Sequence, residues 1–180
     1  MPYDLNSTLW PNREDVFFRD HTFIPQRQSG PHCVSTTLAM LTGTSPETFQ
    51  GTVNTQDPRS WSAALAPWDM QLAYCPTDAR KLKFYLEDLL SVDDLFTLSY
   101  YATEDAREIL QDPDAHGWVT SSHIVLLHRD TILDPASGEA TLVLLHECLE
   151  RHTKRIFRVV KREDKTARPV QLKQEPSMNS

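Results

Sequence analysis

The sequence has few cysteines, only three in 180 residues. Cys33, Cys75 and Cys148 cannot all pair within one chain, and no two of them stand in C-x-x-C spacing. We therefore expect neither a disulfide framework nor a zinc site built from paired cysteines. The fold has to depend on its hydrophobic core, and 180 residues are enough for one domain with such a core.

Long apolar runs and a secretion signal are also missing. No stretch of about 18 consecutive apolar residues occurs, so we expect no transmembrane helix and no membrane partner. Residues 1–6 do not combine a basic start with a following apolar block, so no signal peptide is expected. These two absences predict a cytoplasmic protein.

Positive charge is in deficit over the whole chain. The net charge of −7 disfavours non-specific binding to nucleic acid, and we expect no nucleic-acid partner. The exception is the segment 151–168, which holds eight Lys or Arg residues against two acidic ones. This basic segment is interpreted as a solvated strand face followed by a tail, with docking of an acidic partner as the alternative.

Hydrophobic periodicity and turn residues predict a mixture of helices and strands. The expected helices cover residues 33–43, 59–65, a stretch after Thr77, 103–110 and 141–152, and the expected strands cover 71–74, 95–101, 118–128, 131–134 and 155–161. The sequence therefore predicts a single α+β domain over residues 1–162, with a lead-in segment at 1–22. The polar tail at 163–180 is predicted to be disordered.

Cys33 lies at the start of the best-defined of these helices. A turn at Gly30-Pro31 precedes it, Gly43 suits the helix C-terminus, and one face carries apolar residues at helical spacing (Val34, Leu38 and Leu41). At a helix N-terminus the unpaired N–H groups and the dipole favour a thiolate, which is the nucleophilic form. Cys33 is thus a candidate nucleophile. The alternative is a buried structural cysteine, because free cysteines are commonly buried.

Residues 123–134 predict a β-hairpin with a two-residue turn at Arg129-Asp130. In that register residue 128 pairs with 131 and residue 125 with 134. Because His123 and Val125 share a face, His123 lies diagonal to Asp134 and within reach of it. A carboxylate in that place can fix the imidazole tautomer and stabilise the imidazolium. A shift of one residue in the register would put the two side chains on opposite faces.

A glutamine upstream of Cys33 suggests an oxyanion hole, formed by its amide and the backbone N–H of the cysteine. Gln28 is five residues before Cys33 and Gln26 is seven before, and both are candidates. His146 and His152 are six residues apart and do not share a helix face, so we expect no metal site there. Cys75 and Cys148 are expected in the core.

Taken together, these motifs resemble the papain-like cysteine peptidase superfamily, and within it the bacterial C39-like peptidase group. The shared order is a glutamine, a cysteine-led helix with Leu38-Ala39-Met40, a strand opening with Ser122-His123, and the run Asp134-Pro135-Ala136-Ser137-Gly138. The resemblance covers about residues 24–43 and 118–138. The chain departs from the group at Arg27, where members usually have the glutamine, and at Val34, where they often have glycine.

The resemblance implies a papain-like fold, in which an N-terminal helical part packs the Cys33 helix on an antiparallel sheet. It implies that Cys33 is the nucleophile, His123 the general base and then acid, Asp134 the orienting carboxylate and Gln28 the oxyanion donor. The reaction would be hydrolysis of an amide or isopeptide bond in a protein or peptide substrate through a thioester, without a metal or organic cofactor.

Two alternatives keep the same fold. An acyltransferase or transglutaminase-like enzyme would pass the thioester to an amine or alcohol. A non-catalytic papain-like module would bind a partner protein, and the basic segment 151–168 is its candidate surface.

Overall fold

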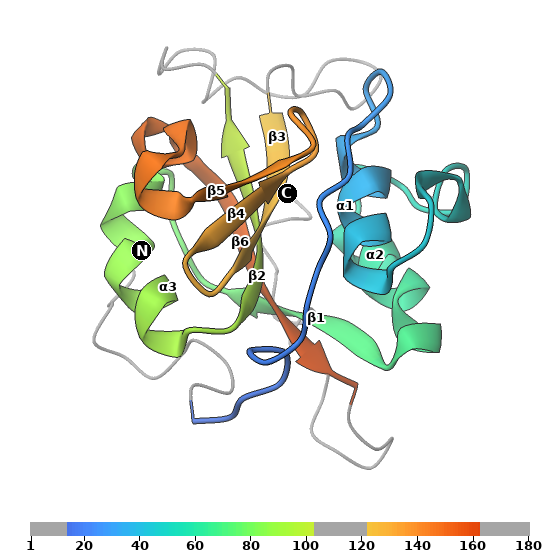
Figure 1. The fold of residues 1–180 in the computed structure, drawn as a ribbon, viewed down its shortest axis with the longest axis horizontal. Coiled ribbons are helices and arrows are strands. Elements are labelled where there is room, and N and C mark those ends of the chain that lie inside the picture. Colours follow the sequence, from blue (N-terminus) through green and yellow to red (C-terminus); the bar gives the residue numbers. More distant parts are fainter. Residues whose placement is uncertain (1–13, 103–121, 163–180) are drawn as a thin grey trace.

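A six-stranded open antiparallel sheet forms the centre of the molecule in the computed structural model, which describes residues 14–102 and 122–162 (Figure 1). The strand order is β1-β6-β2-β3-β4-β5. The strands are β1 (Met70–Cys75), β2 (Leu95–Tyr101), β3 (Ser122–His128), β4 (Thr131–Asp134), β5 (Glu139–Leu142) and β6 (Thr153–Lys161). The predicted α+β class is therefore correct.

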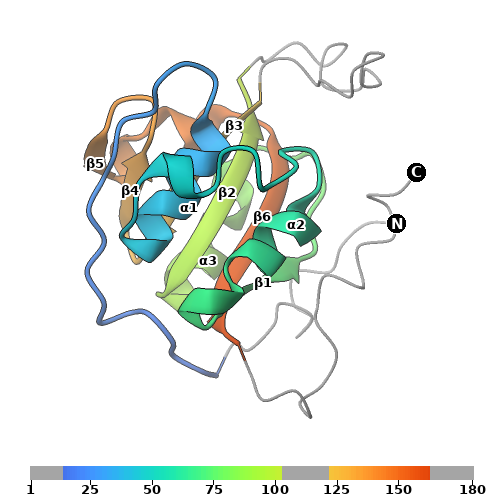
Figure 2. The ribbon, with the colours of Figure 1, turned by 90° about the vertical axis from the view of Figure 1, so that its right-hand side faces the viewer.

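Helices cover both faces of this sheet (Figure 2). On one face lie α1 (Cys33–Thr42) and α2 (Pro58–Ala64), and on the other lies α3 (Leu86–Val92). Short 3₁₀ turns cover Pro46–Thr48, Ala66–Trp68, Leu82–Tyr85, Val143–Leu145 and Glu147–Glu150. None of the helices in the described ranges is long and apolar enough to cross a membrane.

Alternation along the central strands produces a separate hydrophobic core on each face. Leu126 of β3 packs in the core that contains Leu38 of α1, whereas its neighbour Val125 packs in the core that contains Leu89 of α3. The helix α1 ends as predicted, since Gly43 adopts a left-handed conformation with φ of 69°. Seating α1 against β3 in this way brings the start of the helix close to the start of that strand.

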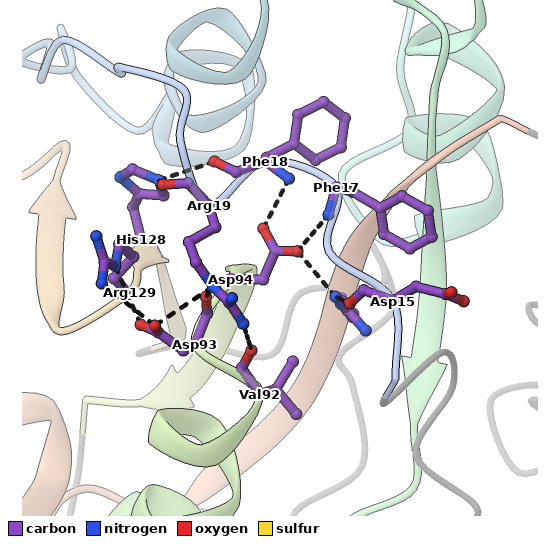
Figure 3. Close-up of polar contacts among 10 residues, drawn as sticks. Asp15, Phe17, Phe18, Arg19, Val92, Asp93, Asp94, His128 and Arg129 are labelled. Carbon is purple, nitrogen blue, oxygen red and sulfur yellow. Dashed lines mark hydrogen bonds and ion pairs between the residues drawn. The ribbon is translucent and has the colours of Figure 1, made fainter.

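A buried carboxylate fixes the chain that leads to α1 (Figure 3). Asp94, at the start of β2, accepts hydrogen bonds from the backbone N–H groups of Phe17 and Phe18 at 2.7 and 2.8 Å. Arg158 of β6 donates to the same carboxylate at 2.8 Å, and both side chains of this ion pair are at most 1% exposed. Nearby, His128 Nε2 lies 3.0 Å from the carbonyl oxygen of Phe18. The lead-in segment is thereby attached to the central strands.

Three details of the predicted elements are wrong. Residues 141–152 form the end of β5 and two 3₁₀ turns instead of a helix, because Leu145 is 77% exposed while Cys148 is fully buried, so no common apolar face exists. Thr77 starts no helix, since the first turn begins only at Leu82. Arg155 and Arg158 are buried rather than solvated, because β6 lies inside the sheet between β1 and β2.

Some predictions lie outside the described residues. These are the helix at 103–110, the first residues of the strand predicted from 118, the first part of the lead-in segment and the tail at 163–180.

Candidate active site

Cys33 is the first residue of α1 and the most accessible of the three free cysteines. It is half-buried, whereas Cys75 is 1% exposed and Cys148 fully buried, as predicted for these two. The first turn of α1 leaves backbone N–H groups beside Cys33 without helical partners. The sulfur therefore sits where backbone donors and the positive end of the helix dipole favour negative charge.

His123 and Asp134 meet across the hairpin in the predicted register. Residue pairs 126–133, 127–132 and 128–131 form the ladder, and Arg129 takes a left-handed conformation with φ of 60° in the two-residue turn. His123 Nε2 lies 2.8 Å from Asp134 Oδ1, and the two side chains are 16% and 14% exposed. The Cys33 side chain lies close enough to His123 to raise the pKa of its ring. Because Asp134 occupies Nε2, the other ring nitrogen, Nδ1, is left for the sulfur.

The charges of this group reinforce one another. Burial alone would lower the pKa of His123, but the hydrogen bond to Asp134 and the nearby Cys33 side chain raise it to about 9. Burial alone would raise the pKa of the Asp134 carboxyl. Hydrogen bonds from His123, His146 and the Ala136 N–H, with the charge of His123, instead hold that pKa well below its usual range. The arrangement favours a protonated His123 ring beside the charged Asp134 carboxylate.

A second histidine, which the sequence did not reveal, holds the other oxygen of the carboxylate. His146 Nε2 lies 2.8 Å from Asp134 Oδ2, and its Nδ1 accepts the N–H of Cys148 at 3.0 Å. An imidazole that accepts at Nδ1 is neutral and carries its proton on Nε2, so His146 donates to Asp134. The predicted helix at 141–152 concealed this contact, because it would have turned His146 elsewhere.

The loop from Asp134 to Gly138 packs closely against the loop that precedes Cys33. Gln28 donates its backbone N–H to the carbonyl of Pro135 at 2.7 Å, which joins the loop before Cys33 to the loop after Asp134. Gly138 has a φ of +72°, and a Cβ atom there would lie 2.7 Å from the Cβ of Arg27. Only glycine allows this close approach. The two loops are thus held side by side, which fixes Cys33 relative to Asp134.

A pocket with a volume of about 550 Å³ opens beside Cys33 and His123. Its walls come from the start of α1, the segment 50–56, the start of β3 and the start of β6. The lining residues are Pro31, His32, Cys33, Val34, Ser35, Gln50, Gly51, Val53, Thr55, Gln56, Trp61, Ser99, Ser122, His123, Ile124, Lys154 and Arg155. A substrate bound in it would place a reactive bond against the sulfur.

Neither predicted glutamine lines this pocket. Gln28 donates its side-chain amide to the carbonyl of Gly30 at 2.8 Å, within its own loop. Gln26 donates to the carbonyl of Thr44, beyond the opposite end of α1. The structure thus brings Cys33 together with a histidine and a carboxylate, and leaves the glutamine amides elsewhere. The unpaired backbone N–H groups at the start of α1 are the donors that lie beside the sulfur.

Within residues 14–102 and 122–162, no group of three or more His, Cys, Asp or Glu side chains is arranged to hold a metal ion.

Comparison of the chain with protein-family models, with curated proteins and with solved structures found no match in any of the three.

Proposed function

We propose that this protein is a cysteine hydrolase, a peptidase that cleaves an amide or isopeptide bond in a protein or peptide substrate. The observation that carries the proposal is the placement of Cys33 beside His123 on the wall of a pocket, with His123 in turn hydrogen-bonded to Asp134. A nucleophile, a base and a group that orients the base are the parts that covalent acyl transfer requires.

The geometry supports a two-stage reaction. In the first stage the Cys33 thiolate attacks the carbonyl carbon, and the resulting oxyanion accepts hydrogen bonds from backbone N–H groups at the start of α1. His123 then gives its proton to the departing amine, the C–N bond breaks and a thioester remains on Cys33. In the second stage water attacks the thioester carbonyl, and His123 takes a proton from that water. The C–S bond then breaks, which releases a carboxylic acid and restores the Cys33 thiolate and the protonated His123.

A papain-like fold is part of the same proposal. Its support is the placement of a cysteine-led helix on an antiparallel sheet, with Cys33, His123 and Asp134 in that chain order. The cytoplasm is the compartment in which we expect the enzyme to work. All three cysteines are free, and reducing conditions keep free cysteines in that form.

The proposal is tested by the rate at which iodoacetamide alkylates Cys33 near pH 6, followed by peptide mass spectrometry. An imidazolium beside the sulfur keeps it reactive at a pH where an ordinary thiol reacts slowly. His123→Gln is expected to slow the alkylation by at least about tenfold, equivalent to about 1.4 kcal/mol. The matched control is His152→Gln, because His152 does not line the pocket and contacts the carbonyl of Ala79 instead.

A comparison of alkylation rates among the three cysteines would not test the proposal, since burial alone protects Cys75 and Cys148. The dependence on His123 is the decisive readout. Equal alkylation rates for wild type and His123→Gln would rule out an activated pair.

A further inference from the structure

Besides His123, the pocket beside Cys33 has two cationic residues in its described lining and no Asp or Glu. Lys154 and Arg155, both from the start of β6, lie on its wall, whereas none of the pocket-lining residues in the described part of the chain is Asp or Glu. Most of the remaining lining is apolar or carries a neutral polar group. A pocket of this composition attracts an anion.

An irregularity of the sheet explains how two consecutive residues reach one pocket. Neighbouring residues of a strand normally point to opposite faces. On β2, Ser99 pairs with Arg155 and the next residue, Tyr100, pairs with Thr153, so Lys154 is left without a partner in this ladder. This is a β-bulge, and bulges re-aim side chains beside functional sites. The bulge lets Lys154 and Arg155 line the same cavity.

Lys154 forms no ion pair with a carboxylate among the residues that the structure describes. Its Nζ lies 3.5 Å from the hydroxyl of Ser122, a neutral group, and no carboxylate forms an ion pair with it in residues 14–102 and 122–162. Burial lowers the pKa of Lys154 to about 8; nearby Arg155 adds to this effect and Cys33 opposes it. A partly buried ammonium group without a carboxylate partner is costly, and an incoming carboxylate would relieve that cost.

We propose that Lys154 and Arg155 bind a carboxylate of the substrate, next to the carbonyl group that Cys33 attacks. This inference rests on the proposed function and names its substrate class: an acyl compound with a carboxylate close to the scissile bond. The cavity of about 550 Å³ fits a ligand of a few residues' size. Two sources can supply the carboxylate, the C-terminus of a short peptide or the side chain of an Asp or Glu residue.

The test compares two alkylating reagents that differ only in charge. Iodoacetate carries a carboxylate and iodoacetamide is neutral, so the ratio of their rates at Cys33 measures attraction of an anion to the pocket. At pH 6.5, Lys154→Gln is expected to lower this ratio about fivefold, and Lys154→Arg is expected to keep it. The control is Lys161→Gln, which removes the same charge from the exposed end of the same strand.

The result separates this inference from the proposed function. A Cys33 that reacts rapidly with both reagents, at a ratio unchanged by Lys154→Gln, would overturn the carboxylate site and leave the cysteine hydrolase intact. A Cys33 that reacts as slowly as an ordinary thiol would count against the hydrolase. The ratio and its dependence on Lys154 would still be measurable in that case, and would still decide for or against the carboxylate site.

Protection of Cys33 from iodoacetamide distinguishes the two sources of the carboxylate. N-acetylalanylalanine and its amide differ in a C-terminal carboxylate, and N-acetylglutamate α-amide and N-acetylglutamine α-amide differ in a side-chain carboxylate. In one of the pairs, the carboxylate member is expected to protect better in wild type but not in Lys154→Gln. No difference in either pair would by itself overturn the proposal.

Discussion

Asp134 accepts a hydrogen bond on each oxygen from a histidine, and the two histidines have different roles. His123 also lies beside Cys33, so we expect it to exchange protons with a substrate. His146 is 8% exposed and touches Asp134 without lining the pocket, so we expect it to act as a positioning residue. Its neutral Nε2–H fixes the plane of the carboxylate, and the plane of the carboxylate in turn orients the His123 ring.

His146→Leu is expected to slow the alkylation of Cys33 at pH 6 by about tenfold, because loss of one hydrogen bond to a charged group costs about 1.5–3 kcal/mol in total. His146→Gln keeps an N–H donor at a similar distance and is expected to restore most of the rate. Both variants lose the acceptor for the Cys148 N–H, so both lose stability. If the Gln and Leu variants alkylate at the same rate, His146 has only a structural role.

Gly138 controls the spacing between the loops that carry Cys33 and Asp134. Gly138→Ala is expected to lower the free energy of unfolding by about 1–3 kcal/mol and to slow alkylation of Cys33, because the new Cβ meets Arg27. Gly43→Ala is the matched control. Its φ of +69° imposes similar backbone strain, but no atom lies within 4 Å of the added Cβ. Loss of stability with unchanged alkylation in both variants would show that the loop contact does not position the site.

At the scale of elements, the Asp94–Arg158 ion pair joins the lead-in segment to β2 and β6. Arg158→Met leaves a buried carboxylate without its cation, and the free energy of unfolding is expected to fall by about 3–5 kcal/mol, measured by urea denaturation. The control Arg59→Met removes an exposed pair, whose side chains are 59% and 40% exposed, and should change stability by less than about 1 kcal/mol. Equal effects in the two variants would contradict the anchoring role.

Local patterns predicted some elements well and others poorly, for physical reasons. The strands 95–101 and 131–134 were predicted with the bounds observed, because their apolar β-formers are flanked by turn residues. The Cys33 helix was predicted nearly as well, since Gly43 ends it. The helix predicted for residues 141–152 is wrong because the leucines follow a helical spacing, yet Leu144 and Leu145 face solvent.

The candidate site was predictable only where it depends on sequence-local geometry. A two-residue turn fixes the hairpin register, and the register brings His123 to Asp134. Two other features depend on tertiary structure and have no local signal. His146 returns to Asp134 through irregular turns, and Lys154 reaches the pocket through a bulge that only strand pairing reveals.

At the scale of the whole molecule, the charged site couples stability to pH. The pKa of His123 is raised to about 9 from an ordinary value of 6.5, so the protonated ring stabilises the fold fully below about pH 6.5. That contribution is lost as the pH rises through about 9. Because the pKa of Asp134 is lowered, its carboxylate stays charged even when the pH falls below 3.8, the ordinary pKa of an aspartate. His123 therefore keeps its charged partner in mild acid.

The difference in unfolding free energy between wild type and His123→Gln should therefore be greatest near pH 5–6 and should shrink between about pH 6.5 and 9. Thermal or urea denaturation across this range measures it. A difference that is constant from pH 5 to pH 10 would mean that the ring carries no extra proton in the folded protein.

The most direct measurement of the central claim is the mass of the intact protein after brief mixing with p-nitrophenyl acetate and acid quenching. An enzyme that works through Cys33 should gain one acetyl group, mapped to the Cys33 peptide and absent from Cys33→Ala, and should lose it to water within the time course. Faster loss on adding an amine would identify acyl transfer in place of hydrolysis. No acetyl group on Cys33, or equal acetylation of wild type and Cys33→Ala, would contradict the account.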